Sequence, residues 1–192
     1  MKGTAPRGKN MAEDEVLKKT LAKSLKEQTE NVMALDVARN DLSVLAKKGT
    51  VQTTELFGVH TFKNVHQMIS TVACELKTET SFEEIVNATF PPASMTGAPK
   101  ISACRLIEKY EASPRKIYSG CLGQIKDNGD FDFCVVIRTI VYSPGRARLS
   151  FHVGSAITAA AVAEQEWEEC LLKADALLKA LGVEINEVTF IK

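Results

Sequence analysis

The chain has 192 residues, of which 45% are hydrophobic and 25% are charged, and its 24 basic and 24 acidic residues balance to a formal net charge of zero. This length suffices for one domain with a sizeable core, and the neutral balance disfavours a nucleic-acid partner. There is no apolar run of about 18 residues, no recognisable signal peptide and no CxxC pair, so we expect a cytoplasmic protein with reduced thiols and no membrane partner.

A loop and a long helix are the first predicted elements. Gly3 and Pro6 interrupt regular structure, so residues Lys2–Arg7 should form a loop. From about Met11 to Leu45, apolar residues recur at spacings of three and four, which is typical of a helix. Glu30 lies within this helix, beside an apolar run.

Two strands and two helices are predicted in the middle of the chain. They are the strands Val51–Phe62 and Met68–Leu76 and the helices Phe82–Thr89 and Lys100–Tyr110. Ser81-Phe-Glu-Glu84 fits a capping box, and Pro99 suits the first turn of the second helix. Small residues precede that helix, so its N-terminus is a candidate anion site, with an ordinary loop-to-helix joint as the alternative.

An antiparallel meander should follow Pro114. Tyr118–Lys126 and Phe131–Tyr142 form a predicted hairpin, because Asn-Gly between them suits a type I′ turn, and Arg146–Val153 adds a third strand. The middle strand is apolar on both faces, so we expect it to be central and covered on both sides. Arg138 in this strand then needs a carboxylate or a ligand anion, and Asp132 is the structural alternative.

The clearest helix of the chain is the last one, Ala163–Gly182. Its predicted buried stripe consists of Trp167, Leu171, Ala174, Leu178 and Leu181. Glu166, Glu169 and Lys173 form a charged row along the border of that stripe. Two carboxylates and an ammonium at the rim of a buried face could hold a metal ion and an anion. The alternative is a solvated edge with a Glu169–Lys173 pair worth roughly 0.3–0.5 kcal/mol.

The order of the predicted elements is helix, strands, helices, antiparallel meander and helix, which is an α+β layout. We predict one domain over residues 1–182 and a short β-prone tail over residues 183–192.

Seven stretches, in the same order, resemble the chorismate-utilising enzymes: aminodeoxychorismate, anthranilate, isochorismate and salicylate synthases. They are Lys2-Gly-Thr-Ala-Pro-Arg-Gly8, Glu30 through Leu42, Val65 through Thr71, Thr96-Gly-Ala-Pro-Lys100, Ile137-Arg-Thr139, Gly154-Ser-Ala-Ile157 and Glu166 through Lys173. The resemblance implies an antiparallel sheet packed with helices, as in the C-terminal half of the family's sandwich fold.

The resemblance also implies a site for chorismate and a magnesium ion. Carried over position by position, Glu30 and Glu169 bind Mg²⁺, and Glu166 lies close by or acts through water. The substrate carboxylates are held by Thr96, Gly97, Arg138, Gly154 and Lys173. Magnesium prefers a few carboxylates together with water and ligand oxygens, so the donor set suits this ion.

Within the family, Lys2 indicates aminodeoxychorismate synthase component I, because anthranilate synthases place alanine at this position. The family's lysine is implied to attack the chorismate ring and expel the C4 hydroxyl. Ammonia from a glutamine amidotransferase subunit then adds at C4 and releases the lysine, on the route to p-aminobenzoate and folate. The alternative is that Lys2 is a frayed terminal residue.

Three positions depart from the family pattern. Gln67 stands where related enzymes often have a second histidine, which in anthranilate synthase is linked to pyruvate elimination. Its loss favours aminodeoxychorismate synthase, which leaves elimination to a separate lyase. Pro92-Ala93 and Gln124 replace small or aromatic family residues near the implied substrate ring.

Family members are more than twice as long, and the resemblance covers only their C-terminal part. We therefore expect that the N-terminal half is missing, and that self-association covers hydrophobic surface exposed by this truncation. Two alternatives to the main assignment remain open. One is an anthranilate or isochorismate synthase, and the other is a non-catalytic fragment of such an enzyme.

Overall fold

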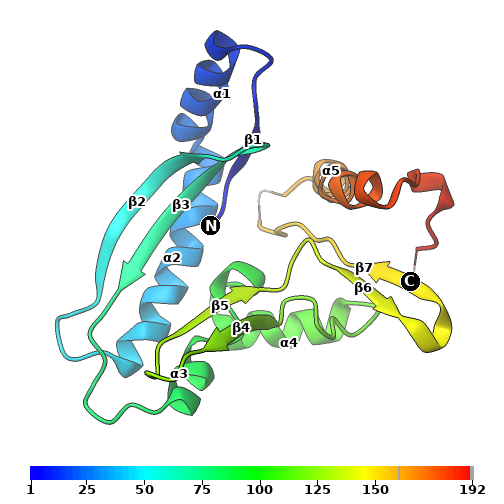
Figure 1. The fold of residues 1–192 in the computed structure, drawn as a ribbon. Helices are drawn as coiled ribbons and strands as arrows, with labels where there is room; N and C mark the ends of the chain where they lie inside the picture. Colours follow the sequence, from blue (N-terminus) through cyan, green and yellow to red (C-terminus); the bar gives the residue numbers. More distant parts are fainter. Residues whose placement is uncertain (160, 191–192) are drawn as a thin grey trace. The chain divides into compact units, whose positions relative to one another are not determined.

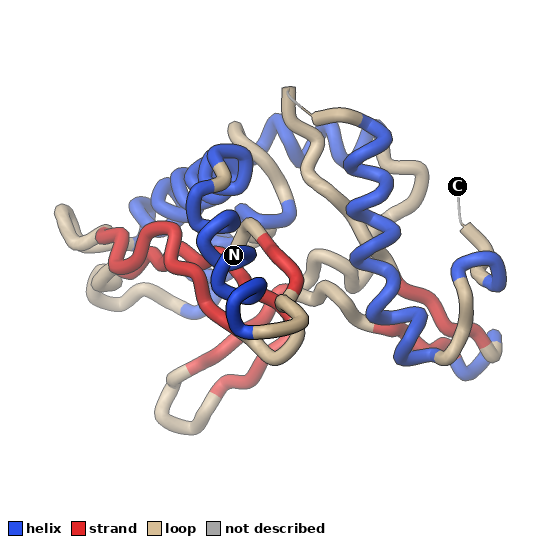
Figure 2. The backbone as a smooth tube through the Cα atoms, turned by 90° about the horizontal axis from the view of Figure 1, so that it is seen from above, coloured by secondary structure: helices blue, strands red, loops and turns tan. Residues whose placement is uncertain are grey.

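The computed structural model describes residues 1–159 and 161–190, and the chain forms two compact units, Met1–Tyr110 and Glu111–Lys192 (Figure 1). Helices and antiparallel strands occur in both units (Figure 2), so the predicted α+β class is confirmed. Within the described ranges, none of the helices combines the length and the apolar character needed to cross a bilayer.

The long N-terminal helix of the prediction is divided in two. After β1 (Thr4–Pro6), α1 runs over Met11–Lys23 and α2 over Leu25–Leu45. Ser24, at φ −69° and ψ 110°, ends the first helix and caps the second, since its hydroxyl accepts the Glu27 N–H at 3.4 Å. A serine side chain offers the backbone this non-helical alternative, which the apolar spacing alone does not reveal.

A three-stranded antiparallel sheet lies against α2 (Figure 1). Its order is β1-β3-β2, with β2 at Gln52–Thr61 and β3 at Val65–Ala73. The centre of β3 is buried, and Met68 is fully inaccessible to solvent. On one side, β3 pairs with the short strand β1 near the N-terminus, which places Thr4 opposite Gln67.

Three short helical elements complete the first unit: α3 (Phe82–Thr89), a 3₁₀ turn η1 (Ala93–Met95) and α4 (Lys100–Tyr110). The capping box is confirmed, because the Ser81 hydroxyl accepts the Glu84 N–H at 3.2 Å while Glu84 accepts the Ser81 N–H at 2.7 Å. Pro99 lies just before α4, where its carbonyl accepts the Ala103 N–H at 3.0 Å.

The second unit begins with the predicted hairpin, formed by β4 (Cys121–Ile125) and β5 (Phe131–Val135). The predicted type I′ turn is wrong. Gly129 has a φ of 87°, whereas Asn128 has no positive φ, and the Gly129 N–H donates to the Lys126 carbonyl at 2.9 Å. This is a type I turn followed by a left-handed glycine, a longer loop that also suits a hairpin.

The predicted continuous middle strand is broken after Val135. Val136 still forms backbone hydrogen bonds with Ser119 and Gly120, and the chain then leaves the hairpin at residues 137–139. It resumes as β6 (Ile140–Ser143), which pairs with β7 (Arg148–Phe151) after the 3₁₀ turn η2 (Pro144–Arg146). The meander is thus two separate two-stranded ribbons rather than one sheet. No strand in it is central, and Phe131 and Phe133 remain 40% and 38% exposed.

The final helix, α5, spans Ala163–Leu181 and ends at Gly182, which has a φ of 68°. Its bounds agree with the prediction, but its buried face is rotated. Glu166 is only 5% exposed, whereas Trp167, predicted to be buried, is 53% exposed and packs on Phe190. The tail predicted as β-prone forms instead a 3₁₀ turn, η3 (Ile185–Glu187), and residues 191–192 lie outside the described residues.

Candidate functional site

Lys2 lies on the wall of a cavity, and both its backbone N–H and its carbonyl are hydrogen-bonded. Its backbone N–H donates to the Met68 carbonyl at 3.2 Å, and its own carbonyl accepts the Asn31 side-chain amide at 3.0 Å. The Lys2 amine lies 3.8 Å from a Glu30 carboxylate oxygen, and the two side chains are 26% and 15% exposed. Local hydrogen bonds thus hold the implied nucleophile in place.

The cavity beside Lys2 has a volume of about 310 Å³ and lies within the first unit. Residues of α2 and β3, including Asn31, Asp41 and Ser70, form part of its wall, and the segment around η1 supplies Pro92 and Ser94. This mixture of apolar and hydrogen-bonding groups is typical of small-molecule sites. Lys2 and Met1 also line this cavity.

Thr96 and Gly97 follow η1, directly after the segment that contributes to this cavity. The Thr96 hydroxyl donates to the Pro92 carbonyl at 3.2 Å, which orients the side chain. At Gly97, a Cβ atom would come within 3.0 Å of the Ala103 Cβ, so a side chain would press on α4. Their implied contact with a substrate carboxylate stays a prediction.

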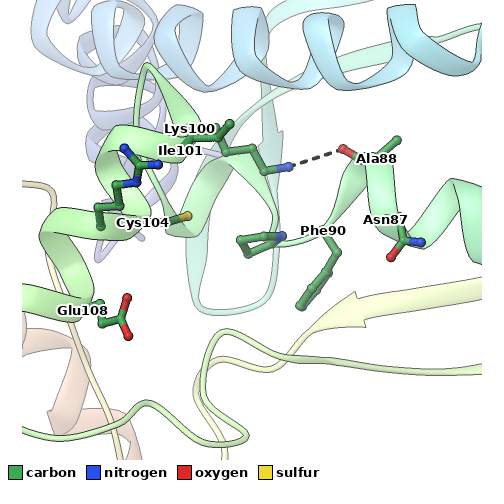
Figure 3. A pocket seen from close by; sticks show the side chains of 9 residues that line it. Asn87, Ala88, Phe90, Lys100, Ile101, Cys104 and Glu108 are labelled. Atoms are coloured by element: carbon green, nitrogen blue, oxygen red, sulfur yellow. Dashed lines mark hydrogen bonds between the residues drawn. The ribbon is translucent and has the colours of Figure 1, made fainter.

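A buried ion pair, which the sequence reasoning missed, anchors α4 to α2. The Lys100 amine lies 2.9 Å from an Asp41 carboxylate oxygen and 3.4 Å from the Ala88 carbonyl. Figure 3 shows the Lys100 side chain directed toward Ala88, at the edge of a second cavity of about 350 Å³ between α3 and α4. Phe90 and Cys104 face into this second cavity.

In the second unit, the charged row of α5 meets the chain that follows β7. The Lys173 amine donates to the Gly154 carbonyl at 2.9 Å and lies 2.7 Å from a Glu169 carboxylate oxygen. Glu166 is buried and accepts the Ser155 hydroxyl. Glu166 is therefore not exposed to solvent, contrary to the alternative of a solvated helix edge. The Glu169–Lys173 ion pair that this alternative predicts is present.

Tyr118 and Cys170 belong to the same cluster, and the sequence reasoning missed both. A Cβ atom at Gly154 would come within 2.9 Å of the Tyr118 hydroxyl oxygen, so a larger residue there would require the Tyr118 side chain to shift. Burial raises the pKa of Tyr118, and its ring stacks on His152 with centroids 5.4 Å apart. Burial also raises the pKa of the Cys170 thiol, against the opposing effect of Lys173.

Arg138 does not lie in a strand near a core, as predicted. It is exposed, has a φ of 50° and lies in the link between β5 and β6. Asp132 lies within β5, but the strand that would align it with Arg138 ends at Val135. Its implied role toward a substrate carboxylate stays a prediction.

The predicted magnesium ligands are divided between the units, with Glu30 in the first and Glu166 and Glu169 in the second. Carboxylate oxygens suit Mg²⁺, and Ser155 holds one Glu166 oxygen as outer partners of metal ligands do. In the described part of the chain, no three His, Cys, Asp or Glu side chains gather as a metal-binding group. That the three glutamates serve one ion stays a prediction.

Comparison with known proteins supports a single family. The family model described as chorismate binding enzyme matches residues 1–179. Aminodeoxychorismate synthase of Streptomyces griseus is 42% identical over 94% of this chain and 25% of its own length. Anthranilate synthase component 1 of Bacillus subtilis is 40% identical over 94% of this chain and 35% of its own length.

The fold is shared with a solved structure named for a 2,3-dihydroxybenzoate-specific isochorismate synthase, DhbC, of Bacillus anthracis. The TM-score is 0.80 at 28% sequence identity, over 95% of this chain and 48% of that one. The chain thus spans about a quarter to a third of the two curated relatives named above. The match to the family model extends over most of the chain, and the chain belongs to the chorismate binding enzymes.

Proposed function

We propose that this chain carries the aminating site of an aminodeoxychorismate synthase component I, which replaces the C4 hydroxyl of chorismate with an amino group. One observation carries the proposal. Lys2, the residue that separates this branch from anthranilate synthases, is held by hydrogen bonds at the wall of a cavity of about 310 Å³. The similarity to aminodeoxychorismate synthase of Streptomyces griseus supports the same branch.

In the proposed reaction the Lys2 amine forms a bond to the chorismate ring as the C4–oxygen bond breaks and the hydroxyl departs with a proton. Ammonia then forms the C4–nitrogen bond, and the bond to Lys2 breaks. Lys2 must lose a proton before it attacks. The Glu30 carboxylate forms an ion pair with the Lys2 amine at 3.8 Å, and it is the group we propose to take up this proton.

The groups of the second unit are proposed to bind the substrate carboxylates and the metal. Lys173, oriented by Gly154 and Glu169, offers a positive charge, and Glu166 and Glu169 offer oxygen ligands. Bound Mg²⁺ would neutralise the charge of the departing hydroxyl. Ammonia would come from a glutamine amidotransferase subunit, and the product would serve p-aminobenzoate and folate synthesis in the cytoplasm.

Gln67 is the observation that separates this proposal from an anthranilate synthase. It is buried, and its amide is engaged with the backbone and hydroxyl groups of Gly3 and Thr4. An amide cannot take up or release a proton near neutral pH, as a histidine can. The position that a histidine occupies in related enzymes therefore supplies no proton-transfer group to the elimination step here.

The test is conversion of chorismate by the purified chain in the presence of MgCl₂ and ammonium chloride, followed by chromatography and mass spectrometry. We expect aminodeoxychorismate, loss of product in Lys2→Ala, and loss of product on addition of EDTA. Lys9→Ala is the matched control, because Lys9 is an exposed lysine near the same loop. Product with the mass of anthranilate, or full activity of Lys2→Ala, would refute the proposal. An inactive chain that binds chorismate would favour the non-catalytic alternative.

A further inference from the structure

Gln67 in β3 forms hydrogen bonds with the two residues that follow Lys2. Its side-chain N–H donates to the Gly3 carbonyl at 2.6 Å, and its side-chain oxygen accepts the Thr4 hydroxyl at 3.1 Å. The residue is 7% exposed, so the bond to Gly3 is buried, whereas the bond to the exposed Thr4 is partly buried. Both polar ends of this amide are therefore committed to the Lys2 loop.

Asn31 in α2 forms a hydrogen bond with the same loop at Lys2 itself. Its side-chain N–H donates to the Lys2 carbonyl at 3.0 Å, and its side-chain oxygen accepts the Ser70 hydroxyl at 2.6 Å. Asn31 is 3% exposed. Two successive carbonyls, those of Lys2 and Gly3, thus each accept a hydrogen bond from a buried amide of a different element.

This arrangement has a cost that packing alone would not require. Burying an amide is unfavourable unless its hydrogen bonds are satisfied, and an apolar residue could fill the same space without that condition. Hydrogen bonds to consecutive carbonyls define where the backbone lies and how it is rotated. A short edge strand such as β1 would otherwise fray, since it has only three residues.

We infer that Gln67 is a positioning residue, and that together with Asn31 it fixes the backbone of Lys2 so that the amine projects at the cavity wall beside Glu30. We call the hydrogen bonds from Gln67 and Asn31 to the Lys2 loop the clamp. Its role in catalysis rests on the proposed function, but the clamp itself is a property of the fold. Gly3 fits this role, because it has a φ of +97° and a Cβ atom added there would lie 3.0 Å from the Met68 Cβ, so a side chain would push the loop away from β3.

The experiment compares Gln67→Met and Gln67→Glu with the matched control Gln28→Met. Gln28 also donates from a half-buried side-chain amide to a backbone carbonyl, that of Ala22 at 2.7 Å, which is not part of the Lys2 loop. The first readout is hydrogen exchange at the Met68 N–H, which donates to the Gly3 carbonyl at 2.8 Å. The second is the rate of Lys2 acetylation relative to Lys9, measured by mass spectrometry after proteolysis.

Both Gln67 variants should exchange the Met68 N–H about tenfold faster than the parent chain, which corresponds to about 1.4 kcal/mol. Lys2 should also be acetylated several-fold faster, because a released loop exposes the amine. Gln67→Glu should match or exceed Gln67→Met, since it replaces the donor with a charged acceptor facing the Gly3 carbonyl. Gln28→Met should leave both readouts unchanged.

Unchanged Met68 exchange in both Gln67 variants would overturn the clamp, as would an equal effect of Gln28→Met. Chorismate turnover supplies the separate arm. If the clamp is confirmed and the parent chain aminates chorismate, Gln67→Met should lower kcat by about tenfold with little change in KM. A confirmed clamp in a chain that makes another product would contradict the proposed function alone.

Discussion

The ion pair between Lys100 and Asp41 allows a quantitative prediction about stability. The two side chains are 16% and 8% exposed, and their charged atoms are 2.9 Å apart. Replacing Lys100 with methionine keeps most of the side-chain volume and leaves the Asp41 carboxylate buried without its cation. Removing one partner of a buried pair costs about 3–5 kcal/mol.

The lower end of that range applies here, because Asp41 also lies on the wall of the cavity beside Lys2, where water can reach it. We therefore expect Lys100→Met to lower the free energy of unfolding by about 3 kcal/mol. Asp41→Leu should cost less, about 2 kcal/mol, because Lys100 is more exposed and keeps the Ala88 carbonyl. The double variant should cost about 2 kcal/mol, well below the sum of the two single variants.

Urea denaturation followed by far-ultraviolet circular dichroism checks these values. With a urea dependence of about 2 kcal/mol per molar, Lys100→Met should lower the midpoint by about 1.5 M. The coupling energy from the double-mutant cycle should be about 3 kcal/mol. Additive effects, within about 0.5 kcal/mol, would show that the pair is not coupled and would refute the reasoning.

Three further predictions follow from single contacts. Hydrogen bonds from Arg7 hold the pKa of Asp14 well below its usual range. The contribution of Asp14 to stability is therefore present above about pH 4 and is lost as pH falls. In thermal melts between pH 5 and 2, the melting temperature of Asp14→Asn should fall less steeply with pH than that of the parent chain. Burial raises the pKa of Cys170, so iodoacetamide should alkylate it more slowly at pH 8 than the exposed cysteines, as measured by mass spectrometry. Gly154→Ala should displace Tyr118 and cost about 1–3 kcal/mol, measured by urea denaturation.

Each of these predictions has a result that contradicts it. An acid limb of unchanged slope in Asp14→Asn would mean that another carboxyl group controls acid unfolding. Equal alkylation rates for all cysteines would contradict the burial of the Cys170 thiol. A Gly154→Ala chain as stable as the parent would show that the Tyr118 hydroxyl moves aside without loss of packing.

Elements with strong local signals were determined by the sequence alone. The capping box at Ser81 and the left-handed glycine at Gly182 define helix ends through hydrogen bonds and backbone freedom that involve only neighbouring residues. The bounds of α3 and α5 could therefore be predicted closely. The family motifs identified Lys2, Glu169 and Lys173 as catalytic, metal-binding and substrate-binding residues, and these roles stay predictions.

Only the tertiary structure decided which face of each element is buried and which distant groups meet. Helical periodicity placed Trp167 inside, yet Glu166 is buried instead, because the segment between β7 and α5 folds back on the helix and brings the Ser155 hydroxyl to its carboxylate. The apolar run around Arg138 resembled one strand, but the chain leaves the ladder there. In the sequence, Gln67 was notable only because related enzymes often have a histidine at this position. Its hydrogen bond to Gly3 depends on the pairing of β1 with β3, which no local pattern specifies.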